Sequence, residues 1–128
     1  REHDLMDAAE LKRRAQATRQ RDLVVGAVKW SVVLPQPVEM RSLLRANQAY
    51  DGVVRDLVAS AITGWSGVTQ GMLVEDLTAE EAAAPAPFST DLAVEYLNGR
   101  QSEFDALAEA LLDAFTEHKR KREAALKN

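Results

Sequence analysis

A run of four cationic side chains near the C-terminal end is the feature of this sequence best suited to chemistry. Lys119, Arg120, Lys121 and Arg122 are consecutive, and such a run can bind an acidic partner or a nucleic-acid backbone. The alternative is structural, because cations in the last turn of a helix interact favourably with the helix dipole. The structural interpretation is preferred, with partner binding kept as the functional one.

Other groups that could do chemistry lack the neighbours that chemistry requires. His3 and His118 are far apart, and neither has a second ligand at a metal-binding spacing. Asp91 and Glu95 are four residues apart on a predicted solvent-facing side, with no basic residue to orient them. We therefore expect no metal site and no catalytic residue, and the protein is not expected to be an enzyme.

Three glycines also fail to form a nucleotide site. Gly64, Gly67 and Gly71 follow a predicted helix, and no Lys-Ser/Thr pair ends the segment, whereas phosphate loops follow a strand. This spacing is typical of a turn. No cofactor is predicted.

Composition sets the broad class of the protein. The 128 residues are 46% hydrophobic and only 5% aromatic, which indicates one domain with a core of Leu, Val and Ala and favours helix packing. The chain contains no cysteine, so disulfides are excluded and a reducing cytosol is the expected compartment. No apolar run approaches the roughly 18 residues that a membrane span needs, and no secretory leader is visible. We expect no membrane association.

Charge is distributed unevenly along the chain. Residues 1–21 hold six basic and four acidic side chains, residues 117–128 hold five and two, and residues 22–116 hold five and fourteen. Basic ends therefore flank an acidic body, which would repel a nucleic-acid backbone. Nucleic acid is not expected as a partner, and it could contact only the ends.

The N-terminal third is predicted to contain one helix and a small β element. Residues 4–21 form a thinly apolar helix, suited to a frayed arm or to a contact between copies in a homo-oligomer. Residues 23–34 are rich in β-branched side chains and predict a strand. Residues 38–43 alternate apolar and polar, which predicts a second strand and a hairpin across Pro35-Gln36-Pro37. The alternative is an early helix through Met40, Leu43 and Leu44.

The remaining segments are predicted to be helical. An apolar stripe from Asn47 to Gly64 predicts a long helix, with Trp65 plugging the core at its end. A surface loop follows, in which a Thr78–Glu81 capping pattern allows one helical turn. Phe88 is predicted to act as a hydrophobic staple before a helix cap at Ser89 or Thr90.

Two helices complete the prediction. A short helix ends at Asn98-Gly99, and a last helix runs from Ser102 to about His118. The predicted fold class is α+β, mainly α, with a small β-hairpin in the N-terminal third. The predicted organisation is a basic helical arm over 1–21, one helical domain over 22–118 with its hairpin near 23–44, and a basic tail over 119–128.

The order of motifs in the second half resembles a known group. A helix is followed by Trp65-x-Gly67-Val68, a variable turn, Pro87-Phe88-Ser89, a short helix with Tyr96-Leu97, and a Leu- and Phe-rich final helix. This order resembles the tail assembly chaperones of long-tailed bacteriophages over about residues 53–115. The basic N-terminal arm and the long, Ala-rich turn before Pro87 depart from the group.

The resemblance implies a non-enzymatic assembly factor in the cytoplasm of the bacterial host. Such a protein binds tail tube or tape-measure protein and leaves before the virion is complete. One alternative is a structural virion component, such as a head-tail connector or minor tail protein. Another is a small nucleic-acid-binding regulator that uses its basic ends.

Overall fold

The predicted fold class is confirmed by a computed structural model, which describes residues 5–46 and 50–127. Helices dominate, and three strands form one antiparallel sheet. The elements in chain order are α1 (Ala8–Ala17), β1 (Gln20–Val25), β2 (Val28–Val33), α2 (Pro37–Ala46), α3 (Tyr50–Ala61), β3 (Ile62–Ser66), a 3-10 turn (Gln70–Met72), α4 (Ala79–Ala83), α5 (Thr90–Asn98) and α6 (Gln101–Lys127). Within the described residues, no helix combines the length and apolar character that a bilayer crossing requires.

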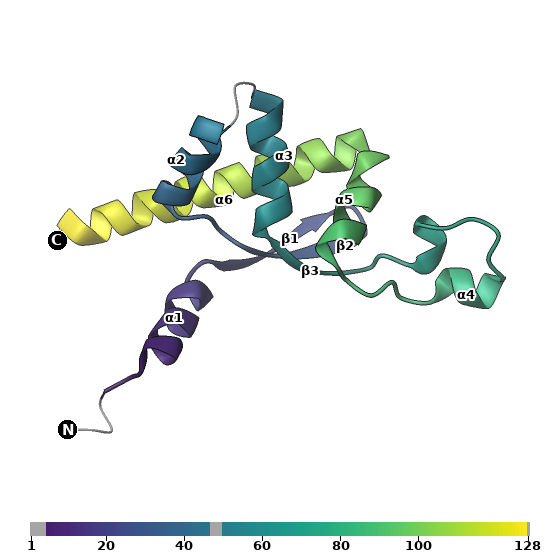
Figure 1. Ribbon diagram of the computed structural model, residues 1–128, viewed down its shortest axis with the longest axis horizontal. Coiled ribbons are helices and arrows are strands. Elements are labelled where there is room, and N and C mark those ends of the chain that lie inside the picture. The colour runs from purple at the N-terminus through teal and green to yellow at the C-terminus, as the bar shows by residue number, and fades with distance from the viewer. Residues whose placement is uncertain (1–4, 47–49, 128) are drawn as a thin grey trace.

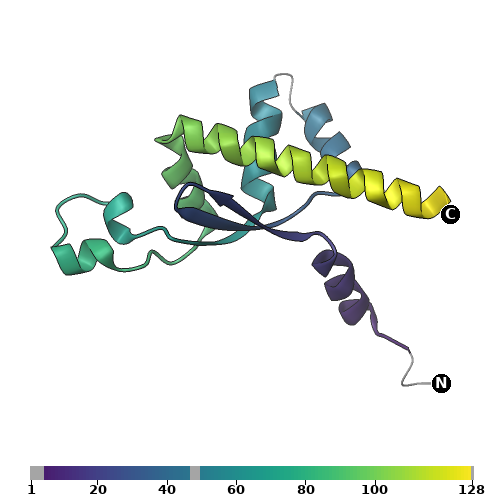
Figure 2. The same cartoon turned by 180° about the vertical axis from the view of Figure 1, so that it is seen from behind.

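The sheet has one covered face and one open face. Its strand order is β1-β2-β3, and Leu23, Trp30 and Trp65 lie side by side across it. Helices α2, α3 and α6 lie above the sheet in Figure 1 and Figure 2, α5 lies at its end, and α1 projects below it. Side chains alternate between the two faces of a strand, so Trp30 is fully buried while Val24 is 70% exposed.

The β-hairpin is present, but it uses residues other than those predicted. The predicted strand over 23–34 is two strands, joined by a turn at Gly26 and Ala27, with Val25 paired to Val28. Gly26 has a φ of 62°, and Ala27 has no positive φ, which is the pattern of a type II′ turn. Gly26, which interrupts the apolar run over 23–34, therefore marks the turn of the hairpin.

The second predicted strand, over 38–43, is wrong. These residues belong to α2, as in the alternative helical interpretation. Pro37 occupies the first helical position, where its missing N–H costs nothing. The Gln36 N–H also donates to Glu39 Oε1 at 3.1 Å, which satisfies an amide at the start of the helix.

The long helix was predicted to run to Gly64, but α3 ends at Ala61 and Ile62 begins β3. Ile62, Thr63 and Trp65 are residue types that favour strands. Gly64 lies opposite Ser31, whose Cβ would be 3.6 Å from an added methyl group. Trp65 therefore extends the sheet and does not plug the end of a helix. The predicted start at Asn47 lies outside the described residues.

The predicted caps of the two short helices are confirmed. Thr78 and Glu81 form a reciprocal capping box on α4, and Ser89 Oγ accepts from the Leu92 N–H at 3.1 Å. Helix α5 ends before Gly99, also as predicted.

The predicted bounds of the last helix were wrong, because α6 begins at Gln101 and continues to Lys127. Ser102 therefore lies inside its first turn and is not its cap. Glu117 pairs with Arg120 and Lys121, and such pairs at three- and four-residue spacing support a continuing helix. The predicted basic tail is helical from Lys119 to Lys127.

Helix α1 contributes nothing to the core. Its N-terminus is capped by Asp7, whose side chain accepts from the Glu10 N–H at 2.8 Å, and none of its residues is buried. The predicted helix over 4–21 was too long, because the chain enters β1 at Gln20. Its predicted start at Asp4 lies outside the described residues.

Candidate partner-binding site

The cationic run lies on the part of α6 that extends beyond the sheet (Figure 1). Its members point in two directions around the helix. Arg120 Nη2 lies 2.5 Å from Glu117 Oε1, and Lys121 Nζ lies 3.8 Å from the same oxygen. These two cations therefore form an exposed cluster with Glu117.

The other two cations, Lys119 and Arg122, line a groove of about 190 Å³ between α6 and the segment before α2. Phe115, Lys119, Arg122 and Leu126 follow at intervals of four, three and four residues, which puts them on one helix face. The full lining, which we call the basic groove, is Arg19, Pro35, Gln36, Pro37, Phe115, His118, Lys119, Arg122, Glu123 and Leu126.

Two arginines come from the strand side: one lines the groove, and the other contacts His118 of the lining. Arg19 is only 8% exposed; its Nη1 donates to the Leu34 carbonyl oxygen at 2.9 Å and lies 3.5 Å from Glu39 Oε1. Arg21 Nη2 lies 3.4 Å from His118 Nδ1. Sequence reasoning missed both arginines, because only the packing of α6 against β1 brings residues so distant in sequence together.

His118 is the titratable group at the centre of these cations. Burial lowers the pKa of His118, and the charges of Arg21, Arg122 and Arg19 lower it further. A guanidinium can only donate hydrogen bonds, so the imidazole Nδ1 facing Arg21 is the acceptor. Near neutral pH, the positive charge of the basic groove is therefore carried by its lysine and arginines.

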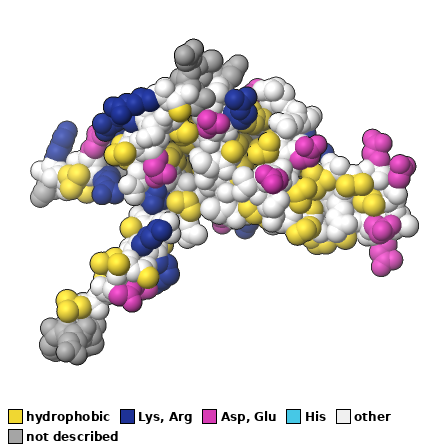
Figure 3. All heavy atoms as spheres, viewed as in Figure 1, with side chains coloured by type: hydrophobic (Ala, Val, Ile, Leu, Met, Phe, Trp, Pro, Cys, Tyr) yellow, Lys and Arg dark blue, Asp and Glu magenta, His cyan; other side chains and the backbone are white. Residues whose placement is uncertain are grey.

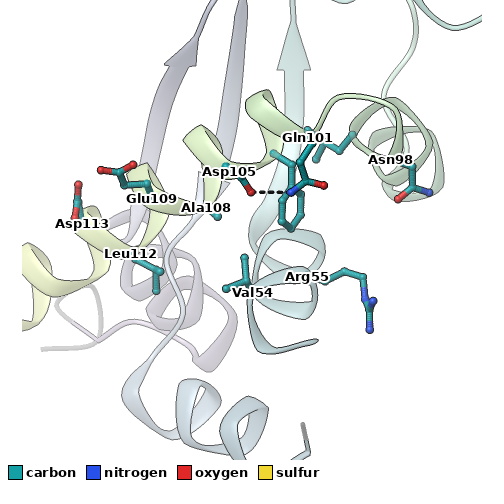
Figure 4. Close-up of a pocket in the computed structure, with 11 residues that line it drawn as sticks. Val54, Arg55, Asn98, Gln101, Asp105, Ala108, Glu109, Leu112 and Asp113 are labelled. Carbon is teal, nitrogen blue, oxygen red and sulfur yellow. Dashed lines mark hydrogen bonds between the residues drawn. The ribbon is translucent and has the colours of Figure 1, made fainter. Parts of the chain in front are cut away.

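A second and larger groove, of about 660 Å³, lies between α3, α5 and α6 (Figure 4). We call it the acidic groove. Leu112 of α6 and Val54 of α3 face its interior, and Glu109 and Asp113 stand along the other edge of α6 (Figure 4). The full lining is Val54, Arg55, Leu97, Asn98, Gln101, Phe104, Asp105, Ala108, Glu109, Leu112 and Asp113. Sequence reasoning missed this groove, although Asp105, Glu109 and Asp113 recur every four residues.

Opposite charges also gather at the two ends of the molecule. Lysines and arginines are prominent on the C-terminal half of α6 and near α1, whereas acidic side chains project from the end that contains α4 (Figure 3). A charged partner is therefore attracted to one end of the molecule and repelled from the other.

The residues of the Trp-x-Gly-Val and Pro-Phe-Ser motifs come together in one structural cluster. The Trp65 ring centroid lies 5.5 Å from that of Phe88 and 5.8 Å from that of Trp30, with edge-on geometry in both pairs. Trp65 Nε1 donates to the Ala86 carbonyl oxygen at 2.9 Å. Val68 is buried, and its carbonyl oxygen accepts from the Ala86 N–H at 2.9 Å. These motifs fasten the segment before α5 to the sheet.

Gly67 is required by the backbone at this point. Its φ is 96°, and a Cβ there would collide with the carbonyl oxygen of Ala27. Only glycine adopts this conformation without strain. The turn after β3 can therefore pass directly against the hairpin.

The pKa of Tyr96 is strongly raised, and packing explains the shift. Tyr96 is 3% exposed, and its hydroxyl donates to Glu103 Oε2 at 2.7 Å. Burial and this hydrogen bond raise the pKa of Tyr96 to about 12. The neutral phenol therefore acts as a structural link between α5 and α6.

The described residues form two grooves that a partner could enter, the basic groove and the acidic groove. Asp91 and Glu95 are exposed, as predicted. No group of three or more metal-ligating side chains occurs in the described part of the chain, and His3 lies outside it. Comparisons with protein-family models, curated proteins and solved structures find no match to this chain.

Proposed function

We propose that this protein is a phage tail assembly chaperone that binds a segment of tail tube or tape-measure protein in its basic groove. The observation that carries the proposal is the combination of apolar and cationic side chains in that groove. Phe115 and Leu126 offer apolar contact, and Lys119 and Arg122 lie between them on the same helix face. Such a surface fits an amphipathic segment with acidic flanks.

Exposure of the groove supports a binding role. Leu126, which lines the groove, is 78% exposed. Large apolar side chains on the rim of a groove contribute binding energy when a partner covers them. Modest affinity suits a factor that must release its partner during assembly.

The order of motifs is the reason for proposing a phage protein. Trp65, Gly67, Val68 and Phe88 carry the resemblance to tail assembly chaperones, and they lie in one cluster of the fold. Their role is to hold the sheet and α5 together. The cytoplasm of the bacterial host is the compartment in which such a factor acts.

Binding to peptides tests the role of the groove. Overlapping peptides from the tail tube and tape-measure proteins of one phage are titrated with this chain, and fluorescence anisotropy reports binding. We expect an acidic amphipathic peptide to bind, and we expect the Lys119→Glu/Arg122→Glu variant to weaken its binding roughly tenfold or more.

The matched control changes the same charges on the same helix. Arg120→Glu/Lys121→Glu alters the cations that pair with Glu117 outside the groove, and we expect binding within about twofold of the unmodified chain. Equal weakening by the two variants would contradict binding in the groove. Absence of binding by every peptide would contradict the proposed function.

A further inference from the structure

Helix α1 places none of its side chains in the core formed by the described residues. No residue of α1 is buried; Leu11 is 52% exposed, and Leu5 just before the helix is 76% exposed. Isolated helices of about ten residues are marginal in water. A surface that covers the apolar side of α1 would therefore stabilise it.

The exposed stripe of α1 has a defined chemistry. Ala8, Leu11 and Ala15 follow at three- and four-residue steps and share one face. Lys12 flanks this face on one side, and on the other side Arg14 Nε lies 3.0 Å from Glu10 Oε1, the oxygen that also pairs with Arg13. The helix thus presents a narrow apolar stripe with Lys12 at its basic edge, and its two alanines allow close approach.

The acidic groove offers the complementary surface. Val54 and Ala108 form a buried floor, with exposed fractions of 7% and 5%. Leu112 is half-buried beside them, and Asp105, Glu109 and Asp113 form an exposed wall. Residues four apart lie on one side of a helix, so the three carboxylates form a single row.

Dimensions and charge both match α1. A helix rises 1.5 Å per residue, so α1 is about 15 Å long and the row from Asp105 to Asp113 covers about 12 Å. Lys12, at the basic edge of α1, would face that row. In both ribbon views, α1 of the same molecule projects away from α3 and from the first half of α6 (Figure 1, Figure 2). It joins β1 through Thr18 and Arg19, which is too short a connection to cross the sheet.

We propose that the acidic groove of one copy binds α1 of a second copy, so that the protein self-associates through this contact. The proposal goes beyond the chaperone function, because it uses a different groove and holds whatever the basic groove binds. Leu11 packs on Leu112 and Ala108 of the other copy, and Lys12 faces the acidic row. Salt weakens the contact, because its charges are exposed.

Sedimentation velocity over a range of protein concentrations measures the self-association. We expect a concentration-dependent shift from monomer to larger species, weakened about fivefold by Lys12→Glu and by Glu109→Lys. The double variant Lys12→Glu/Glu109→Lys restores opposite charges and is expected to recover most of the association. Lys29→Glu on the open sheet face and Glu80→Lys on α4 are matched controls that leave it unchanged.

Disulfide trapping tests the register directly, because the chain has no cysteine of its own. Leu11→Cys protein is mixed with a size-tagged Leu112→Cys protein under mild oxidation. We expect a mixed disulfide dimer, and we expect much less of it when Val24→Cys, which is also exposed, replaces Leu11→Cys.

Three results would overturn the proposal. One is a chain that stays monomeric at all protein concentrations up to about 100 µM. Another is self-association that none of the charge reversals changes. The third is equal trapping by Leu11→Cys and Val24→Cys. Binding of an unrelated basic helical peptide to a monomeric chain would assign the groove to a different partner.

Discussion

At the residue scale, Tyr96 shows how one side chain joins three parts of the chain. Its hydroxyl contacts Glu103 of α6, and the Arg100 guanidinium carbon lies 4.0 Å from its ring centroid. Arg100 Nη2 in turn donates to the carbonyl oxygen of Met72 at 2.7 Å. The phenol therefore stabilises the junction between α5, α6 and the 3-10 turn.

Tyr96→Phe should lower the free energy of unfolding by about 1 to 2 kcal/mol at neutral pH, because a hydrogen bond to a carboxylate is lost. The pKa of this phenol rises from about 10 when unfolded to about 12 in the fold. Its contribution is complete below pH 10 and is lost as the pH rises towards 12, since the unfolded chain ionises first. Urea unfolding at pH 8 and pH 11 measures this. A variant that loses as much stability as the unmodified chain between these pH values would contradict the assignment.

His118 gives the opposite pH dependence. Its pKa is lowered from 6.5 by burial and by the neighbouring arginines, so the unfolded chain binds a proton more readily than the folded chain does. Stability is therefore lost as the pH falls through about 6.5 and below. His118→Gln should reduce the loss of stability between pH 7.5 and pH 5.5, as measured by urea unfolding. An unchanged pH dependence would show that other groups dominate.

At the element scale, the turn after β3 depends on one backbone conformation. Gly67→Ala should lower the free energy of unfolding by about 2 to 4 kcal/mol, because a methyl group would collide with Ala27 at a positive φ. Gly99→Ala is the matched control, since nothing lies within 4 Å of its added Cβ, and its effect should stay within about 0.5 kcal/mol. Thermal or urea unfolding of both variants measures these changes in the free energy of unfolding. Similar stabilities would contradict the strain at Gly67.

Local signals predicted the short elements well and the long-range pairings poorly. The Thr78 capping box and the Ser89 cap depend on neighbours three residues away, and both are confirmed. Trp65 was assigned to a helix because it continues a helical stripe. In the structure its pairing with Trp30 of β2 places it in a strand. Such pairing joins residues 35 positions apart, and no periodicity within a segment reports it.

In the candidate site, too, the sequence predicted a local feature, and only the structure revealed the contacts between distant residues. The run from Lys119 to Arg122 was visible as a partner-binding candidate, but the helix faces divide it into a pair inside the basic groove and a pair outside. Arg19 lines the groove and Arg21 contacts its His118 only because α6 packs against β1. The sequence could show where charge lies along the chain, and the packing of α6 decided which charges act together.

At the scale of the whole molecule, α6 organises two distinct surfaces. Its first half provides the wall of the acidic groove, and its second half provides the basic groove. Leu107 and Leu111, on the core side of the same helix, are fully buried. A single rigid helix can therefore carry one surface for a second copy and another for a partner.

The measurement that tests the central claim most directly follows the protein through phage assembly. Affinity-tagged chain is recovered from cells expressing the tail genes, and mature particles are analysed for the same chain by mass spectrometry. The chaperone account predicts capture of tail tube or tape-measure protein, loss of that capture in Lys119→Glu/Arg122→Glu, and absence of the chain from virions. Stoichiometric retention in purified particles, or no capture of either tail protein, would contradict it.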